Sequence, residues 1–243
     1  MKPAGPQTLA VAYPSSSWPT YHRTANRNGY YPALPAPHGL HYLCSRRLDG
    51  QVYAQPLIVG SLLIIATEHN SVYAFSLVTH VLIWHSGLGT PEPRTSLPCG
   101  KIAPSVGITG TPVYDPATGS IFAVGWTTGG SYTLFSIAIS TGRIRWHRPL
   151  DIAGRDRRAE QQRGALAVAN GRIYVPFGGL FGDCGNYVDY LAAWATSGVG
   201  TMTKYVVPTK REGGICAAPG PARTRGILTW VHRGRSYCPP AGR

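Results

Sequence analysis

Three consecutive segments of the chain repeat the same series of four short apolar strands, and this repeat limits the possible folds more than any other feature. Pro56, Pro112 and Ala165 occupy matching places in the three segments, so the unit recurs after 56 and then 53 residues. Each unit is long enough for four strands and one longer loop. A repeat of this kind predicts an array of similar antiparallel sheets.

Turn-forming residues separate the expected strands. The segments Asp115–Gly119 and Ala169–Gly171 combine Asp, Asn, Pro and Gly in the way that tight antiparallel connections require. The chain holds 30 Gly and 21 Pro in 243 residues, which argues against a helical bundle. We therefore expect four-stranded antiparallel meanders in units of about 49–89, 106–150 and 160–208, with the third strand of the last unit at 187–192.

Both faces of these meanders are apolar, so each face needs a cover. Stacking similar meanders around an axis provides that cover and protects most strand edges. The predicted fold is all-β: an incomplete β-propeller of about three blades with partial strands at each end, spanning 18–221. Residues 1–17 are expected to be disordered and 222–243 to form a basic irregular tail. A β-sandwich is the alternative that many short strands also allow.

Two units carry a matching outer hairpin that ends in tryptophan. The first reads Tyr73-Ala-Phe-Ser-Leu-Val-Thr-His-Val-Leu-Ile-Trp84 and the second Ile137-Ala-Ile-Ser-Thr-Gly-Arg-Ile-Arg-Trp146. These hairpins resemble the pyrroloquinoline-quinone-like (PQQ-like) β-propeller repeat. The resemblance implies that Trp84 and Trp146 dock each blade on the next one. Both hairpins depart from the family repeat at the position where that repeat carries Asp; this chain has Ser76 and Ser140 there.

The resemblance also implies a function and a location. The chain is similar to an exported bacterial branch of the family, so we expect an extracytoplasmic, non-catalytic scaffold or binding module. No apolar region of a signal peptide is visible in the sequence. A fragment of a propeller enzyme, such as a PQQ-dependent dehydrogenase, is the alternative. The PQQ dehydrogenases use two adjacent cysteines, which this sequence lacks; we therefore expect no PQQ, and we assign no catalytic or metal-binding residue. The loss of the repeat after about Pro221 suggests truncation or a frame shift.

In a propeller, the loop before a blade's first strand and the loop between its second and third strands lie on the same face. Cys99 and Cys184 fall in two such loops of neighbouring units, which predicts a disulfide between them; two separate thiols are the alternative. The same face gathers the longest loops, so any ligand should bind there. The candidate ligand-contacting residues are His69, Lys101, Asp183 and Tyr187.

The formal net charge of +13 comes from 23 Lys and Arg against 10 Asp and Glu. Such a charge can indicate a polyanionic partner. Seven of the basic residues lie within 209–243, however, so nucleic-acid binding is not the expected function. No apolar run is long enough to span a bilayer. The expected partner is an unidentified protein or polymer, and a second copy of the chain could complete the ring.

Overall fold

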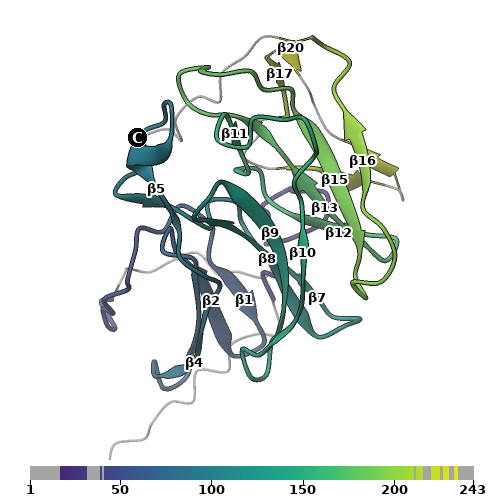
Figure 1. Cartoon of the computed structure of the whole chain (residues 1–243). Coiled ribbons are helices and arrows are strands. Elements are labelled where there is room, and N and C mark those ends of the chain that lie inside the picture. Colours follow the sequence, from purple (N-terminus) through teal and green to yellow (C-terminus); the bar gives the residue numbers. More distant parts are fainter. Residues whose placement is uncertain are drawn as a thin grey trace, which may run out of the picture.

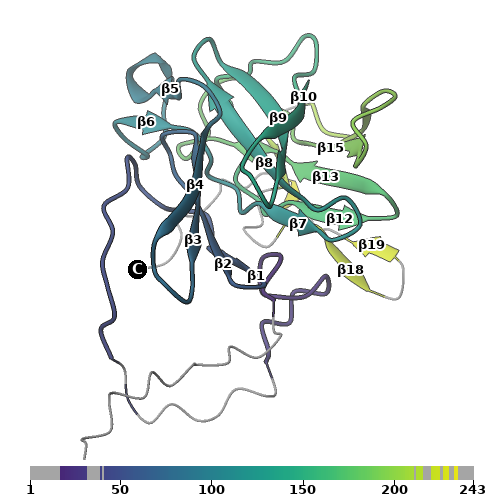
Figure 2. The ribbon, with the colours of Figure 1, turned by 90° about the horizontal axis from the view of Figure 1, so that it is seen from below.

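The computed structural model describes residues 17–31, 39, 41–210, 212–215, 220–224, 227–229 and 233–234. Three four-stranded antiparallel sheets lie side by side in chain order (Figures 1 and 2). The first consists of β1 (Leu57–Val59), β2 (Leu62–Ala66), β3 (Ser71–Ser76) and β4 (Leu82–Gly87). The second consists of β7 (Val113–Asp115), β8 (Ser120–Thr127), β9 (Ser131–Ala138) and β10 (Ile144–Pro149). The third consists of β12 (Ala167–Ala169), β13 (Arg172–Pro176), β15 (Tyr190–Ala195) and β16 (Thr203–Val206).

These sheets are the blades of an incomplete β-propeller, which confirms the predicted fold class. Each sheet pairs its strands in sequence order, with neighbours antiparallel. The third strand of blade three begins at Tyr190 and not at 187, because Asp189 is held in the preceding loop: its backbone N–H donates to Gly213 O, 3.0 Å away. Short elements join the blades: β5 (Glu92–Pro93) pairs with β6 (Ser105–Val106), and the 3-10 turn η1 (Arg94–Ser96) follows β5.

The middle blade shows why the blades stack. Side chains of a strand alternate between its two faces. In β8, Ile121 and Ala123 pack with blade one, whereas Phe122 and Val124 pack with blade three. All four are buried. The hydrophobic cores therefore lie between the blades, and both faces of β8 are buried.

The indoles of Trp84 and Trp146 each rest on a glycine turn of the following blade. A methyl group at Gly142 would lie 2.7 Å from a ring carbon of Trp84, and one at Gly198 would lie 2.6 Å from Trp146. Only glycine leaves room for this approach. Trp84 also donates from Nε1 to Ile139 O, 2.9 Å away. The structure thus places both predicted docking residues against the next blade.

The described residues between 213 and 234 repeat the pairing of the inner half of blade three. There, β11 (Glu160–Gln161) pairs with β14 (Gly178–Gly179), and β12 pairs with β13. In the same order, β17 (Gly213–Gly214) pairs with β20 (Arg233–Gly234), and β18 (Ala222–Thr224) pairs with β19 (Ile227–Thr229). Figure 2 shows β18 and β19 beside β12. The segment 222–243, expected to be an irregular tail, therefore contains three short strands among its described residues. These strands have the arrangement of a fourth blade's inner hairpin.

The described N-terminal segment 17–31 crosses the inner strands of the blades. Trp18 forms an antiparallel bridge with Ile58 of β1, and the backbone N–H of Tyr114 in β7 donates to Pro19 O, 2.8 Å away. The Arg27 guanidinium donates to Leu166 O at 2.8 Å and to Pro221 O at 3.2 Å. Burial lowers the pKa of Arg27 to about 10, which leaves the side chain charged at neutral pH. This segment ties the four inner strands together. Residues 1–16 of the segment expected to be disordered lie outside the described residues.

Replacing a docking tryptophan tests the contact between blades. Trp84 is 7% exposed, and Trp84→Ala removes both its packing and its hydrogen bond. We expect the free energy of unfolding to fall by about 3–5 kcal/mol, measured by urea denaturation followed by circular dichroism. Tyr42 is 82% exposed, so Tyr42→Ala is the matched control and should change the free energy by less than about 0.5 kcal/mol. Equal effects of the two substitutions would contradict the docking role of Trp84.

Candidate functional site

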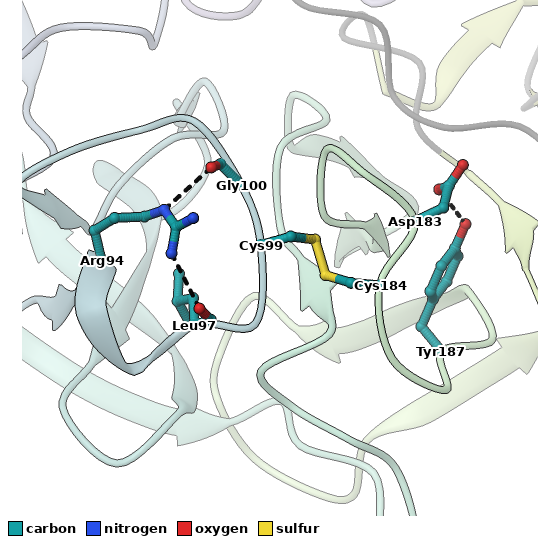
Figure 3. Close-up of a disulfide and its surroundings, with 7 residues drawn as sticks. All are labelled: Arg94, Leu97, Cys99, Gly100, Asp183, Cys184 and Tyr187. Carbon is teal, nitrogen blue, oxygen red and sulfur yellow. Dashed lines mark hydrogen bonds between the residues drawn. A yellow bond between two sulfur atoms is a disulfide. The ribbon is translucent and has the colours of Figure 1, made fainter.

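One face of the blades carries the long connections, and we call it the loop face. It is built by the segments that lead from β4 to β7 and from β10 to β12, together with the β2–β3, β8–β9 and β13–β15 turns. Antiparallel pairing places all of these ends on the same side. The loop between β13 and β15 and the loop that contains η1 lie next to each other there (Figure 3).

A disulfide joins these two loops. Cys99 and Cys184 are bonded in the structure, and their Cα atoms lie 6.1 Å apart, within the range that disulfides require. Close by, the backbone N–H of Gly100 donates to Phe181 O, 3.0 Å away. Both half-cystines also pack against the core between blades two and three. The two loops are thus held together by a covalent bond, a hydrogen bond and apolar packing.

Arg94 fixes the path of the first loop from within. Its Nε donates to Gly100 O at 3.1 Å and its Nη1 donates to Leu97 O at 3.0 Å (Figure 3). A guanidinium can bridge two carbonyl groups in this way because its donors diverge in a rigid plane. The side chain therefore closes the loop from η1 to the disulfide into a compact turn.

A pocket of about 240 Å³ opens on the loop face beside this disulfide-linked pair of loops. Three cationic side chains contribute to its wall: Arg94 and Lys101 from the loop before β7, and Arg163 from the loop before β12. The remaining wall is polar at two positions and otherwise apolar or glycine. Its residues are Tyr53, Leu97, Gly100, Ile102, Val106, Gln161, Leu180 and Phe181.

The other two cations, Lys101 and Arg163, have aromatic or charged neighbours. The Lys101 Nζ lies 4.2 Å from the centroid of the Phe181 ring, which is a cation–π contact. Burial lowers the pKa of Arg163, while the nearby Tyr53 and Glu68 oppose that change. An arginine remains protonated at neutral pH despite such a shift. The pocket therefore presents charged side chains that are positioned before any ligand arrives.

Glu68 lies behind this wall and is 2% exposed. Its Oε2 accepts hydrogen bonds from Gly107 N at 2.6 Å and from Thr109 Oγ1 at 3.1 Å. Burial raises the pKa of Glu68 to about 7, although the positive charge of Arg163 acts in the opposite direction. The carboxyl group fastens the β2–β3 turn to the entry of blade two and is not part of the pocket wall.

The four predicted ligand-contacting residues lie in different environments, and not all of them line the pocket. Lys101 lines the pocket. Tyr187 is fully buried, and its hydroxyl donates to Asp183 Oδ1 at 2.7 Å (Figure 3), so these two residues stabilise their own loop. His69 is exposed in the β2–β3 turn and does not line the pocket.

Sequence reasoning missed Arg94 and Arg163. Both lie in the long loops that precede the first strand of a blade. With Pro112 matched to Ala165, Arg163 aligns with Gly110 and not with Arg94, so the repeat gives no signal for this pair. Among the described residues, no three His, Cys, Asp or Glu side chains gather closely enough to hold a metal ion. No helix in the described part of the chain has the length and hydrophobicity needed to cross a bilayer.

The chain resembles solved structures but no family model and no curated protein sequence matches it. The quinohemoprotein alcohol dehydrogenase ADHIIG from Pseudomonas putida HK5 superposes with a TM-score of 0.60 at 20% identity, covering 79% of this chain and 27% of that chain. The quinohemoprotein alcohol dehydrogenase from Comamonas testosteroni gives 0.51 at 17% identity, with the same coverage of both chains. A europium-containing methanol dehydrogenase gives 0.54 at 18% identity, covering 74% of this chain and 30% of that chain.

The disulfide can be tested in the purified protein. Peptide mapping without reductant should yield one linked peptide that contains Cys99 and Cys184. Cys99→Ser should lower the free energy of unfolding by about 2–4 kcal/mol, because it releases a constraint on the unfolded chain. Cys44 is exposed and free, so Cys44→Ser is the control and should have little effect. Alkylation of both Cys99 and Cys184 in the unreduced protein would contradict the bond.

At these identities the likeness shows the fold alone. The chain spans between a quarter and a third of the length of these enzymes. Its antiparallel blades, stacked in chain order, are therefore those of the β-propeller fold that these dehydrogenases share.

Proposed function

We propose that the chain is a PQQ-like β-propeller repeat protein that acts without catalysis, as a scaffold or binding module, and that its ligand binds in the pocket on the loop face. The observation that carries this proposal is the pocket itself. Its wall combines three cations with apolar side chains, and a disulfide and Arg94 fix the loops that form it. A concave site with a few positioned polar groups is what small-molecule binding requires.

The same proposal places the protein outside the bacterial cytoplasm. A disulfide between two loops persists in an oxidising compartment and is rare in a reducing one. The Cys99–Cys184 bond supports export in this sense. A protein or polymer partner, or a second copy that completes the ring, belongs to the scaffold form of the proposal.

PQQ and its calcium ion are not part of the proposal. In the family that this chain resembles, a catalytic site needs calcium ligands beside the quinone, and the described residues offer no group of three metal-ligating side chains. The segment 17–31 also lies along the inner strands, with the charged Arg27 held by Leu166 O and Pro221 O. We therefore propose no bound quinone and derive no catalytic step through one.

A thermal-shift screen of small metabolites tests the binding function. A compound that binds in the pocket at about 100 times its Kd should stabilise the protein by about 2.7 kcal/mol. That stabilisation should raise Tm by about 5–10 °C for a chain of this size. The pocket variant is Ile102→Trp, which fills the space with an indole. The control is Val199→Trp, at a site that is 73% exposed.

The expected result is a rise in Tm for the native protein and for the control variant, and no rise for the pocket variant. Stabilisation that persists equally in Ile102→Trp would contradict binding at this pocket. The enzyme alternative predicts instead that added PQQ and Ca²⁺ bind, and that alcohol is oxidised in a dye-linked assay. Turnover in that assay would overturn the non-catalytic proposal.

A further inference from the structure

The charge of the pocket indicates the sign of the charge on its ligand. Its wall holds Arg94, Lys101 and Arg163 and no carboxylate. The three cations come from two different inter-blade loops, so the fold brings together charges that are far apart in the sequence. Like charges gathered around a small cavity repel one another, and a bound anion removes that repulsion. An anionic group on the ligand would therefore be stabilised there more than a neutral or cationic group.

The uncharged part of the pocket wall determines the chemical character of the rest of the ligand. Leu97, Ile102, Val106 and Leu180 supply apolar surface, and Phe181 supplies an aromatic ring. Leu97, Val106 and Leu180 are at most 6% exposed, so the apolar surface that a ligand can cover comes mainly from the half-buried Ile102 and Phe181. Apolar surface buried by a ligand here would contribute roughly 25 cal/mol per Å². A purely inorganic anion would leave this surface without a partner, so the ligand needs an apolar body as well as a charge.

The dimensions of the pocket limit the ligand's size. A volume of about 240 Å³ corresponds to roughly eight water molecules, each of which takes about 30 Å³ in the liquid. A ligand of roughly eight to ten non-hydrogen atoms therefore matches the space. The side chain that meets its charge most directly is Lys101, which is exposed and lies over the Phe181 ring with its ammonium 4.2 Å from the ring centroid.

We propose that the pocket binds small organic monoanions, with a carboxylate near Lys101 and Arg163 and a short apolar or aromatic body against Ile102 and Phe181. This inference rests on the proposed binding function and names its ligand class. The positive charges select the anion, and the apolar wall selects against small inorganic ions.

Three probes of nearly the same shape test the ligand class: phenylacetate, phenylacetamide and phenethylammonium. Their Kd values are measured on the full chain by ¹H–¹⁵N NMR titration, following the amides of Gly100, Lys101 and Phe181. We expect phenylacetate to bind at least tenfold more tightly than either of the other two at low ionic strength. Added salt should weaken the binding of phenylacetate and leave that of phenylacetamide nearly unchanged.

A matched pair of variants locates the charge. Lys101→Met should weaken the binding of phenylacetate at least fivefold without changing the affinity for phenylacetamide. Lys101→Arg should restore the binding of phenylacetate. Lys204 is an exposed lysine outside the pocket, so Lys204→Met should leave every Kd unchanged. A lysine that only stabilises the loop would affect all three probes alike, and that result would overturn the role assigned to Lys101.

The outcomes separate this inference from the proposed function. If phenylacetamide or phenethylammonium binds as tightly as phenylacetate and shifts the same amides, the ligand class is wrong while the pocket still binds ligands. If none of the three probes shifts these amides at 10 mM (about ten thousandfold weaker than a typical micromolar ligand), the ligand class is also wrong. The metabolite screen with Ile102→Trp then decides the binding function independently.

Discussion

The burial of both faces of the middle blade's inner strands between its two neighbours is the constraint on which the rest of the structure depends. Alternate residues of β8 belong to two different cores, with Ile121 facing blade one and Phe122 facing blade three. A single four-stranded sheet with two apolar faces would expose both in water, which is unfavourable by roughly 25 cal/mol per Å² of apolar surface. The Trp84 and Trp146 contacts with glycine turns fix the distance between blades. The loops that form the pocket take their positions from this stack.

The sequence carries the repeat, and the structure confirms the fold that the repeat predicts. Period-two alternation and turn residues such as Asn170–Gly171 are local signals, so they can be recognised without the fold. The third strand of blade three was misplaced because Asp189, which looks like a strand residue, is held by the backbone of Gly213 and Ile215. No local pattern reports such a distant contact.

The candidate site was only partly predictable. Topology alone placed the longest loops on one face and Lys101 among them, and it brought Cys99 towards Cys184. The contributions of Arg94 and Arg163 depend on how two loops of different blades fold against each other, which a single sequence does not encode locally. Arg27 was missed for the same reason, because it binds the carbonyl groups of Leu166 and Pro221 across the inner strands. Tyr187 proved to be a buried residue whose polar atom serves its own loop.

Differential scanning calorimetry of the full chain tests the central claim that the cores lie between the blades. If each blade is stabilised by its neighbours, the blades cannot unfold separately, and the calorimetric enthalpy of unfolding should equal the van't Hoff enthalpy in one transition. Separate transitions for individual blades, with a calorimetric enthalpy well above the van't Hoff value, would contradict the claim.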